Sequence, residues 1–246
     1  MTISNPPEPI SPEQTEQRAP PRAIGREPIF NRMPYGVMAI LAILILVELI
    51  SRFGEPNVIR PIMERGYLSI ATLLSDLRGG RVIDALLPLI TYQFLHGGMF
   101  HLVMNAMLLL QAGPIAEAGL SKRGSGPVRF VLFFLSCGVA SGLAIAAFSA
   151  NGEAEVIGSS GSISGVFAGF LWAALGLARP NQAMLKPVIS AAIVFLFINV
   201  GLAWVARETN LAAIAWEGHL GGFVAGLILY PLFVRVQIVK RSPNPN

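Results

Sequence analysis

The sequence predicts an all-α membrane protein: a six-transmembrane-helix bundle with a long, partly helical first outer loop. Of its 246 residues, 53% are hydrophobic and only 13% are charged, whereas soluble domains carry about 25% charged residues. A spanning helix needs about 20 mostly apolar residues. Six segments meet this requirement, namely residues 35–52, 98–116, 128–148, 158–178, 187–206 and 216–236. Together they predict one membrane domain, residues 34–236.

Two polar tails flank the predicted membrane domain. Residues 1–33 are rich in proline, glutamate and arginine, a composition that cannot bury a core, so we expect a disordered cytoplasmic tail. They do not read as a cleavable signal peptide, because no apolar stretch follows a basic start. Residues 237–246 form a short basic tail. The single cysteine, Cys137, excludes an internal disulfide.

The basic residues predict the orientation of the helices. With the N-terminus in the cytoplasm, 12 of the 18 lysines and arginines fall on the cytoplasmic side and 6 on the outer side. Positive charge is enriched on the cytoplasmic side of membrane proteins, so we expect both termini inside. The absence of a targeting presequence favours a bacterial inner membrane, with the membrane of an organelle as the alternative. Residues 53–97 then form the long outer loop. Its apolar stretches are too short to span, so they predict interfacial or re-entrant helices.

The stretch from Val156 to Phe170 combines several serines and glycines at the outer end of the fourth segment. Taken alone, the spacing of Gly161, Gly165 and Gly169 favours a helix face that another helix approaches closely. The alternative is that Ser160 is a nucleophile, held where that approach brings it a partner.

Polar side chains from three segments favour the nucleophile. The second, fourth and sixth segments all run from outside to inside. His101 and Asn105 are four residues apart, on one helix face, and they lie near the same outer boundary as Ser160 and His219. Glycines at 222 and 226 give the sixth segment its own small-residue face. Two such faces can cross closely, which would bring His219 to Ser160.

This arrangement predicts nucleophilic catalysis by a dyad. Ser160 would attack a carbonyl and His219 would take its proton; Glu217 lies on another helix face and does not complete a triad. His101, Asn105 and the backbone N–H of Ser160 are candidate donors to an oxyanion. The sequence contains no H-E-x-x-H zinc motif and no G-x-S-x-G elbow. We expect no metal, no cofactor and no nucleic-acid partner.

These residues resemble the rhomboid family of intramembrane serine proteases. G-S-S-G at 158–161 matches the family's G-x-S-G, H-L-V-M-N at 101–105 its H-x-x-x-N, and H-L-G-G-F-V-A-G at 219–226 its sixth-helix histidine motif. The resemblance covers about residues 34–236. It implies the same roles for Ser160, His219, His101 and Asn105, with structural support from the motif glycines Gly158, Gly161, Gly222 and Gly226.

The resemblance also implies that the fifth segment, with Phe195, Phe197 and Trp204, is a movable gate for substrate helices. Two positions depart from the family pattern. Leu87 and Pro88 stand where many members carry Trp-Arg, and Ser164 stands where some members carry an aromatic side chain under the histidine.

The leading hypothesis is therefore an endopeptidase that cleaves transmembrane segments of membrane proteins near the outer membrane boundary. Its partners would be transmembrane protein substrates and the lipid bilayer; the sequence carries no signal for an oligomeric state. The alternative is a catalytically inactive rhomboid-like protein that binds client transmembrane helices. A small transporter is disfavoured because no internal inverted repeat is evident.

Overall fold

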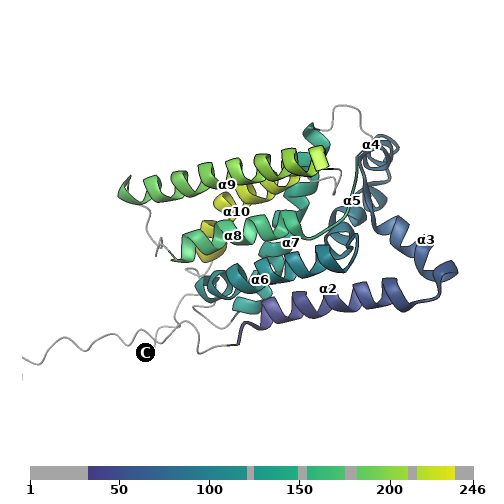
Figure 1. The fold of residues 1–246 in the computed structure, drawn as a ribbon, viewed down its shortest axis with the longest axis horizontal. Helices are drawn as coiled ribbons and strands as arrows, with labels where there is room; N and C mark the ends of the chain where they lie inside the picture. Colours follow the sequence, from purple (N-terminus) through teal and green to yellow (C-terminus); the bar gives the residue numbers. More distant parts are fainter. Residues whose placement is uncertain (1–32, 121–124, 149–153, 175–181, 210–214, 236–246) are drawn as a thin grey trace, which may run out of the picture. The chain divides into compact units, whose positions relative to one another are not determined.

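A computed structural model describes residues 33–120, 125–148, 154–174, 182–209 and 215–235. The predicted tails, residues 1–33 and 237–246, lie outside this range except for Met33. Six helices correspond to the six predicted segments (Figure 1): α2 (Tyr35–Phe53), α6 (Met99–Leu120), α7 (Gly126–Phe148), α8 (Ser160–Ala174), α9 (Gln182–Thr209) and α10 (Trp216–Arg235). The prediction of a helical membrane bundle is confirmed.

The helices differ in how much of a membrane they can cross. Four of them are long and apolar enough to span a bilayer: Tyr35–Phe53, Met99–Leu120, Gly126–Phe148 and Trp216–Val234. Two described stretches, Ser160–Ala174 and Ile189–Leu202, are shorter apolar helices. The C-terminal end of the predicted fourth segment, residues 175–178, lies outside the described residues. α8 is therefore the shortest of the six bundle helices as described.

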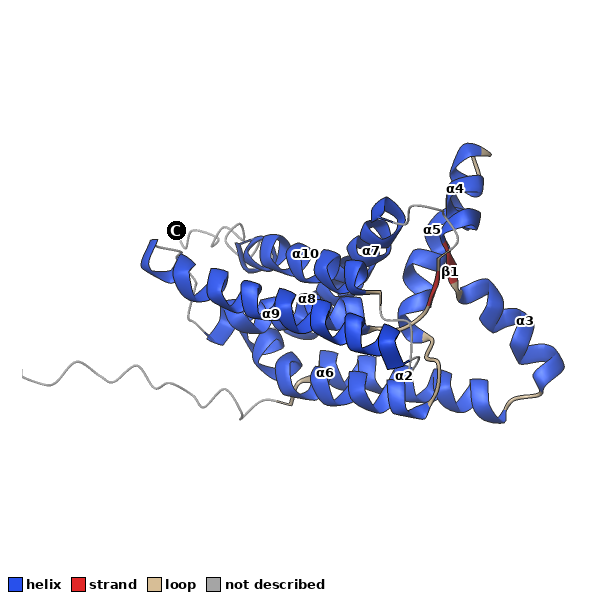
Figure 2. Cartoon of the chain, turned by 45° about the horizontal axis from the view of Figure 1, so that its top comes forward, coloured by secondary structure: helices blue, strands red, loops and turns tan. Residues whose placement is uncertain are grey.

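The chain between α2 and α6, the predicted first outer loop, is partly helical, as predicted. It contains α3 (Pro56–Gly66), α4 (Ile70–Arg78), α5 (Val82–Thr91) and a 3₁₀ turn, η2 (Tyr92–Phe94). Between α3 and α4, β1 (Leu68–Ser69) pairs in antiparallel register with β2 (Glu155–Val156), so that Leu68 lies opposite Val156. β1 lies beside α5 in Figure 2. The pairing joins the outer loop to the chain segment that leads into α8.

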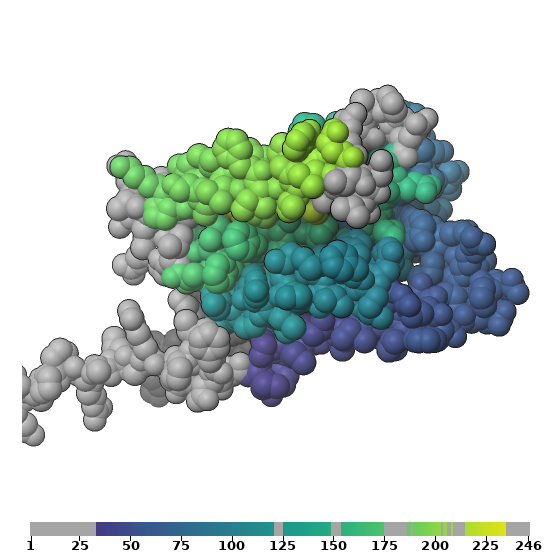
Figure 3. Space-filling model, in the orientation of Figure 1, coloured from purple at the N-terminus to yellow at the C-terminus, as the bar shows by residue number. Residues whose placement is uncertain are grey.

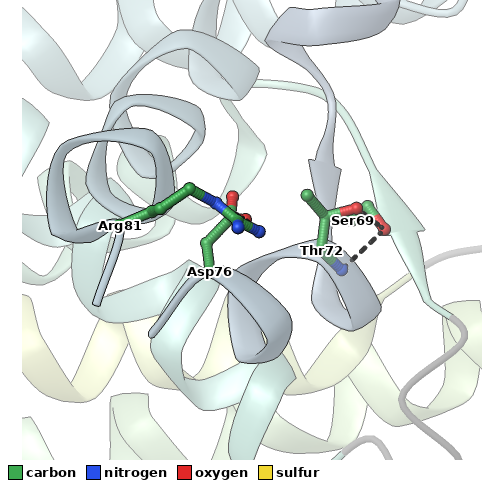
Figure 4. A network of polar contacts seen from close by, with 4 residues as sticks. All are labelled: Ser69, Thr72, Asp76 and Arg81. Carbon is green, nitrogen blue, oxygen red and sulfur yellow. Dashed lines mark hydrogen bonds and ion pairs between the residues drawn. The ribbon is translucent and has the colours of Figure 1, made fainter. Parts of the chain in front are cut away.

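Two local contacts hold α4 in this loop (Figure 4). The Ser69 hydroxyl accepts a hydrogen bond from the backbone N–H of Thr72 at 3.4 Å and so caps the helix N-terminus. At the other end, Arg81 donates from Nε to the buried Asp76 carboxylate at 2.9 Å. This hydrogen bond and the carboxylate charge raise the pKa of Arg81. The turn between α4 and α5 is thereby fixed.

α8 lies at the centre of the bundle, against α6, α7 and α10. Its buried hydroxyls are satisfied by the protein, as buried polar groups generally are: Ser162 donates to Gln93 Oε1 at 2.9 Å, and Ser164 donates to the Ser160 carbonyl at 2.8 Å. Large apolar side chains of α2 and α9 are instead exposed. Figure 3 shows both helices on the surface of the molecule. This distribution suits a bundle surrounded by lipid rather than water.

A buried carboxylate links the C-terminal part of α6 to the N-terminus of α2. Glu117, near the end of α6, accepts hydrogen bonds from the backbone N–H groups of Gly36 at 3.1 Å and Val37 at 2.9 Å. These N–H groups belong to the first turn of α2 and have no partner within their own helix. The carboxylate therefore caps α2 from α6, where the helix dipole also favours negative charge.

We expect Glu117→Ala to lower the free energy of unfolding by about 1 to 3 kcal/mol, because it leaves two buried N–H groups unpaired. Thermal unfolding of the purified protein in detergent measures this loss. Glu64→Ala is the matched control, since Glu64 is exposed and pairs with Arg60 on the surface at 3.3 Å. Exposed ion pairs contribute about 0 to 1 kcal/mol, so equal losses in the two variants would contradict the capping role.

Candidate active site

The backbones of α8 and α10 touch at their glycines. A methyl group on Gly222 would overlap the carbonyl oxygen of Gly161, and one on Gly226 would overlap that of Gly165. The two glycine faces therefore meet, as their spacing predicted. Side chains of any size at these positions would push the helices apart. At this crossing, Gly161 directly follows Ser160, and Gly222 lies one helical turn after His219.

Ser160 and His219 are in hydrogen-bond contact. His219 Nε2 lies 2.8 Å from Ser160 Oγ. The other ring nitrogen, Nδ1, lies 2.7 Å from Oδ1 of Asn199 on α9. The structure thus adds a third residue to the two that sequence analysis brought together. Sequence analysis missed Asn199, although it is the only asparagine or glutamine between residues 187 and 206. A polar amide in an apolar membrane segment indicates a residue with a structural or functional hydrogen bond.

The three neighbouring serines have other partners. Ser162 and Ser164 donate to the groups described above, and Ser159 Oγ lies 3.3 Å from His96 Nε2. Burial lowers the pKa of His96 to about 4, so this histidine is neutral at physiological pH. Of the four serines from 159 to 164, only Ser160 meets His219. Ser164 does not stand in for an aromatic support of the ring, because its hydroxyl is bound to the Ser160 carbonyl.

The predicted oxyanion donors surround Gly158, just before α8. Gly158 has φ +121°, a conformation that favours glycine, and a side chain there would lie against the imidazole of His101 and within 4.0 Å of Asn105 Nδ2. Nδ1 of His101 accepts a long hydrogen bond from Gly97 N at 3.5 Å, which leaves Nε2 on the Gly158 side. Both donors therefore converge beside the residue two positions before Ser160.

Of these two predicted oxyanion donors, Asn105 has the more unusual surroundings. It is 3% exposed, and its Nδ2 has no hydrogen-bond partner among the residues that the structure describes. Buried donors are rarely left unpaired, because the desolvation penalty is then not recovered. An unpaired amide beside Gly158 is suited to a ligand that carries an acceptor oxygen.

The aromatic residues of α9 are divided between the bundle and its surroundings. Phe195 stacks on Phe223 of α10 with ring centroids 4.2 Å apart, and lies 5.8 Å from Phe167 of α8. Phe197 and Trp204, in contrast, are 74% and 65% exposed. α9 is thus held to the described bundle by Phe195 and Asn199, which are one helical turn apart.

The fold and the site define a multi-pass helical membrane protein with a serine–histidine contact at the start of its central helix. Comparison with family models agrees: the Rhomboid domain matches residues 84–236. The chain therefore belongs to the rhomboid family, which confirms the predicted resemblance. The matched range begins in α5 and includes all four predicted catalytic and oxyanion residues.

Similarity to individual relatives is distant. The chain is 32% identical over 139 residues to the rhomboid protease GluP of Bacillus subtilis (strain 168), covering 56% of this chain and 24% of that protein. It is 28% identical to RHOMBOID-like protein 4 and to RHOMBOID-like protein 5 of Arabidopsis thaliana, over 60% and 63% of this chain and 34% and 47% of theirs. The chain thus spans less than half the length of each of these relatives.

The glycine crossing generates a prediction about packing. We expect Gly222→Val to destabilise the protein by at least about 1 to 3 kcal/mol, the usual cost of overpacking, and to slow the reaction of Ser160 with a fluorophosphonate. Gly201→Val is the matched control, because a side chain at Gly201 on α9 would meet nothing within 4 Å. Thermal unfolding and labelling rates measure both effects. Equal behaviour of the two variants would show that the crossing does not set the site.

Proposed function

We propose that this protein is an intramembrane serine endopeptidase that cleaves transmembrane segments of membrane proteins near the outer membrane boundary. The observation that supports it best is the 2.8 Å contact between Ser160 Oγ and His219 Nε2. In the proposed reaction, Oγ attacks the peptide carbonyl while Nε2 takes the hydroxyl proton. His219 then returns this proton to the leaving amine. Water next attacks the carbonyl carbon of the acyl-serine while His219 takes its proton, and His219 returns that proton to Ser160 Oγ as the carboxylic acid product leaves.

The negative charge that develops on the carbonyl oxygen needs donors that are already in place. We assign this role to Asn105 Nδ2, His101 Nε2 and the backbone N–H of Ser160. Asn105 Nδ2 has no partner among the described residues, so it is available to a substrate oxygen without breaking an existing bond. Ser160 is the first residue of α8, and N–H groups in a first helical turn also lack partners within the helix. The positive end of the helix dipole adds to their effect.

We also propose an orientation and a location for the protein in the membrane. The distribution of lysines and arginines given above supports a topology with both termini in the cytoplasm. The start of α8 and the outer loop paired with it then lie on the outer side, which would let water reach the serine. The membrane domain is assigned to residues 34–236, in a bacterial inner membrane. The substrates are transmembrane proteins, whose scissile segment must enter from the lipid.

The proposed dyad predicts two inactive variants. Ser160→Ala and His219→Ala should each abolish cleavage of a single-span test substrate in proteoliposomes, while both proteins remain folded. Ser160→Ala should also abolish fluorophosphonate labelling, because the attacked oxygen is gone. Gel analysis of cleavage products and labelling of the purified variants measure these outcomes.

Ser159→Ala and Ser164→Ala are the matched controls, since these hydroxyls bond to other groups, and they should keep measurable activity. Full activity in Ser160→Ala would refute the nucleophile. A wild-type protein that binds client helices but neither cleaves them nor reacts with the fluorophosphonate would favour the inactive, client-binding alternative.

A separate prediction concerns Asn105. We expect Asn105→Ala to lower kcat about 10²- to 10³-fold, as for loss of one oxyanion donor, with little change in KM. Thermal stability should change little, because the Nδ2 that is removed makes no hydrogen bond within the described protein. Steady-state kinetics and thermal unfolding distinguish this role from a structural one. A variant that melts early, but whose folded fraction turns over normally, would show that Asn105 only supports the helices.

A further inference from the structure

Asn199 contacts the histidine of the proposed dyad. Its Oδ1 lies 2.7 Å from Nδ1 of His219, on the opposite side of the ring from Ser160. The Asn199 side chain comes from α9, whereas Ser160 and His219 come from α8 and α10. One imidazole therefore joins three helices.

The orientation of the Asn199 amide follows from its second hydrogen bond. Nδ2 donates to the carbonyl oxygen of Phe195 at 2.8 Å, and a carbonyl can only accept. The amide oxygen must then be the atom that faces His219. Because this oxygen can only accept, Nδ1 of His219 carries a hydrogen. In the neutral ring, Nε2 is then the unprotonated nitrogen and faces Ser160 Oγ.

We propose that Asn199 is a positioning residue that holds His219 in the tautomer and ring orientation needed to deprotonate Ser160, and that this support exists only while α9 is packed against α10. This inference rests on the proposed function of the dyad. The opposite tautomer would present an N–H to the serine hydroxyl and would have no lone pair for its proton. An acceptor on Nδ1 excludes that state, as the third residue does in serine hydrolases.

The proton balance of the reaction is compatible with a neutral amide. The proton of Ser160 moves to Nε2 as Oγ bonds to the carbonyl carbon, and the Nδ1 hydrogen stays bonded to Asn199 Oδ1 throughout. The same Nε2 proton then leaves with the amine. Asn199 never exchanges a proton, and it avoids the large cost of placing a carboxylate in an apolar membrane segment.

The dependence on α9 follows from where Asn199 sits. Phe195, one turn earlier, stacks on Phe223, which is one turn after His219 on α10. The stack and the hydrogen bond therefore form a pair of neighbouring contacts between α9 and α10. Moving α9 away to admit a substrate helix would break both. Chemistry would then require that α9 return, so that cleavage follows closure.

The kinetic test compares variants of Asn199. Asn199→Leu keeps the approximate size but removes the acceptor, and should lower kcat about 10- to 100-fold, as expected for a misplaced catalytic group, with KM nearly unchanged. Asn199→Asp restores the acceptor and should recover part of kcat. Its carboxylate favours the protonated ring, so the acidic limb of the pH–rate profile should move to higher pH. Val200→Ala, at the exposed neighbouring position, is the control for α9 and should behave as wild type.

The pH comparison is made against the wild type because other titratable groups act on the same ring. Among the described residues, His101 on α6 acts electrostatically on His219, and Glu217 lies on α10 itself. Both are unchanged in every variant. A shift that appears only in Asn199→Asp is therefore assigned to the residue at position 199.

A spectroscopic test reads the tautomer directly and does not depend on proteolysis. In ¹⁵N-histidine NMR of the Ser160→Ala protein, His219, assigned by its loss in His219→Gln, should be the Nδ1–H tautomer. Asn199→Leu should shift it toward the Nε2–H tautomer, and Phe195→Leu should produce a smaller shift in the same direction. If Asn199→Leu does not fold, Phe195→Leu carries the test, whereas Asn199→Asp, which keeps an acceptor for Nδ1, should retain the Nδ1–H tautomer.

An unchanged tautomer in Asn199→Leu, or in Phe195→Leu where Asn199→Leu does not fold, would overturn the positioning role, even if kcat falls, since a purely structural residue would give that result. Failure of the proposed function looks different: wild-type protein would not be labelled at Ser160, whereas the tautomer could still depend on Asn199.

Discussion

The backbone contact between α8 and α10 is the constraint on which the rest of the site depends. Gly161 and Gly165 face Gly222 and Gly226 so closely that no side chain fits between them. Helices with ordinary side chains at their contact lie 8 to 10 Å apart. Here the approach is set by main-chain atoms, which cannot change rotamer, so the separation is fixed more sharply than a side-chain contact could fix it. The distance between Ser160 and His219 is therefore set by the distance between α8 and α10.

The first outer loop contributes a second set of constraints. Gly158 donates its N–H to the carbonyl of Tyr92 at 2.9 Å, and the Tyr92 hydroxyl donates to the Gly138 carbonyl on α7 at 2.7 Å. Gln93, beside Tyr92, accepts from Ser162 on α8. The loop is therefore bonded to the chain on both sides of Ser160, to Gly158 before it and to Ser162 after it. It positions the segment around Gly158 and is part of the framework of the site.

Sequence patterns predicted the helices and the meeting of Ser160 with His219, because the length of an apolar stretch and the spacing of glycines are local features of a sequence. They did not predict Asn199, since a single amide carries no periodicity and its partner depends on how α9 is rotated and placed. The β1–β2 pairing was missed for a similar reason: two residues per strand are too few to show alternation. The assignment of roles to these residues stays a prediction.

The proposed mechanism makes sense of the near absence of formal charge from this constellation. In that mechanism Ser160, His219, Asn199 and Asn105 carry no charge before the reaction, and isolated charges within a membrane are costly. During the proposed reaction an imidazolium and an oxyanion form together, close enough to attract one another strongly in a low dielectric. Each charge is also stabilised by a side-chain dipole: the Asn199 carbonyl faces the imidazolium, and the Asn105 amide would face the oxyanion. A carboxylate at position 199 would stabilise the imidazolium more strongly. It would, however, also be charged and desolvated in the resting protein, where no imidazolium is present to offset that cost. An amide exerts its full effect only when the ring is charged.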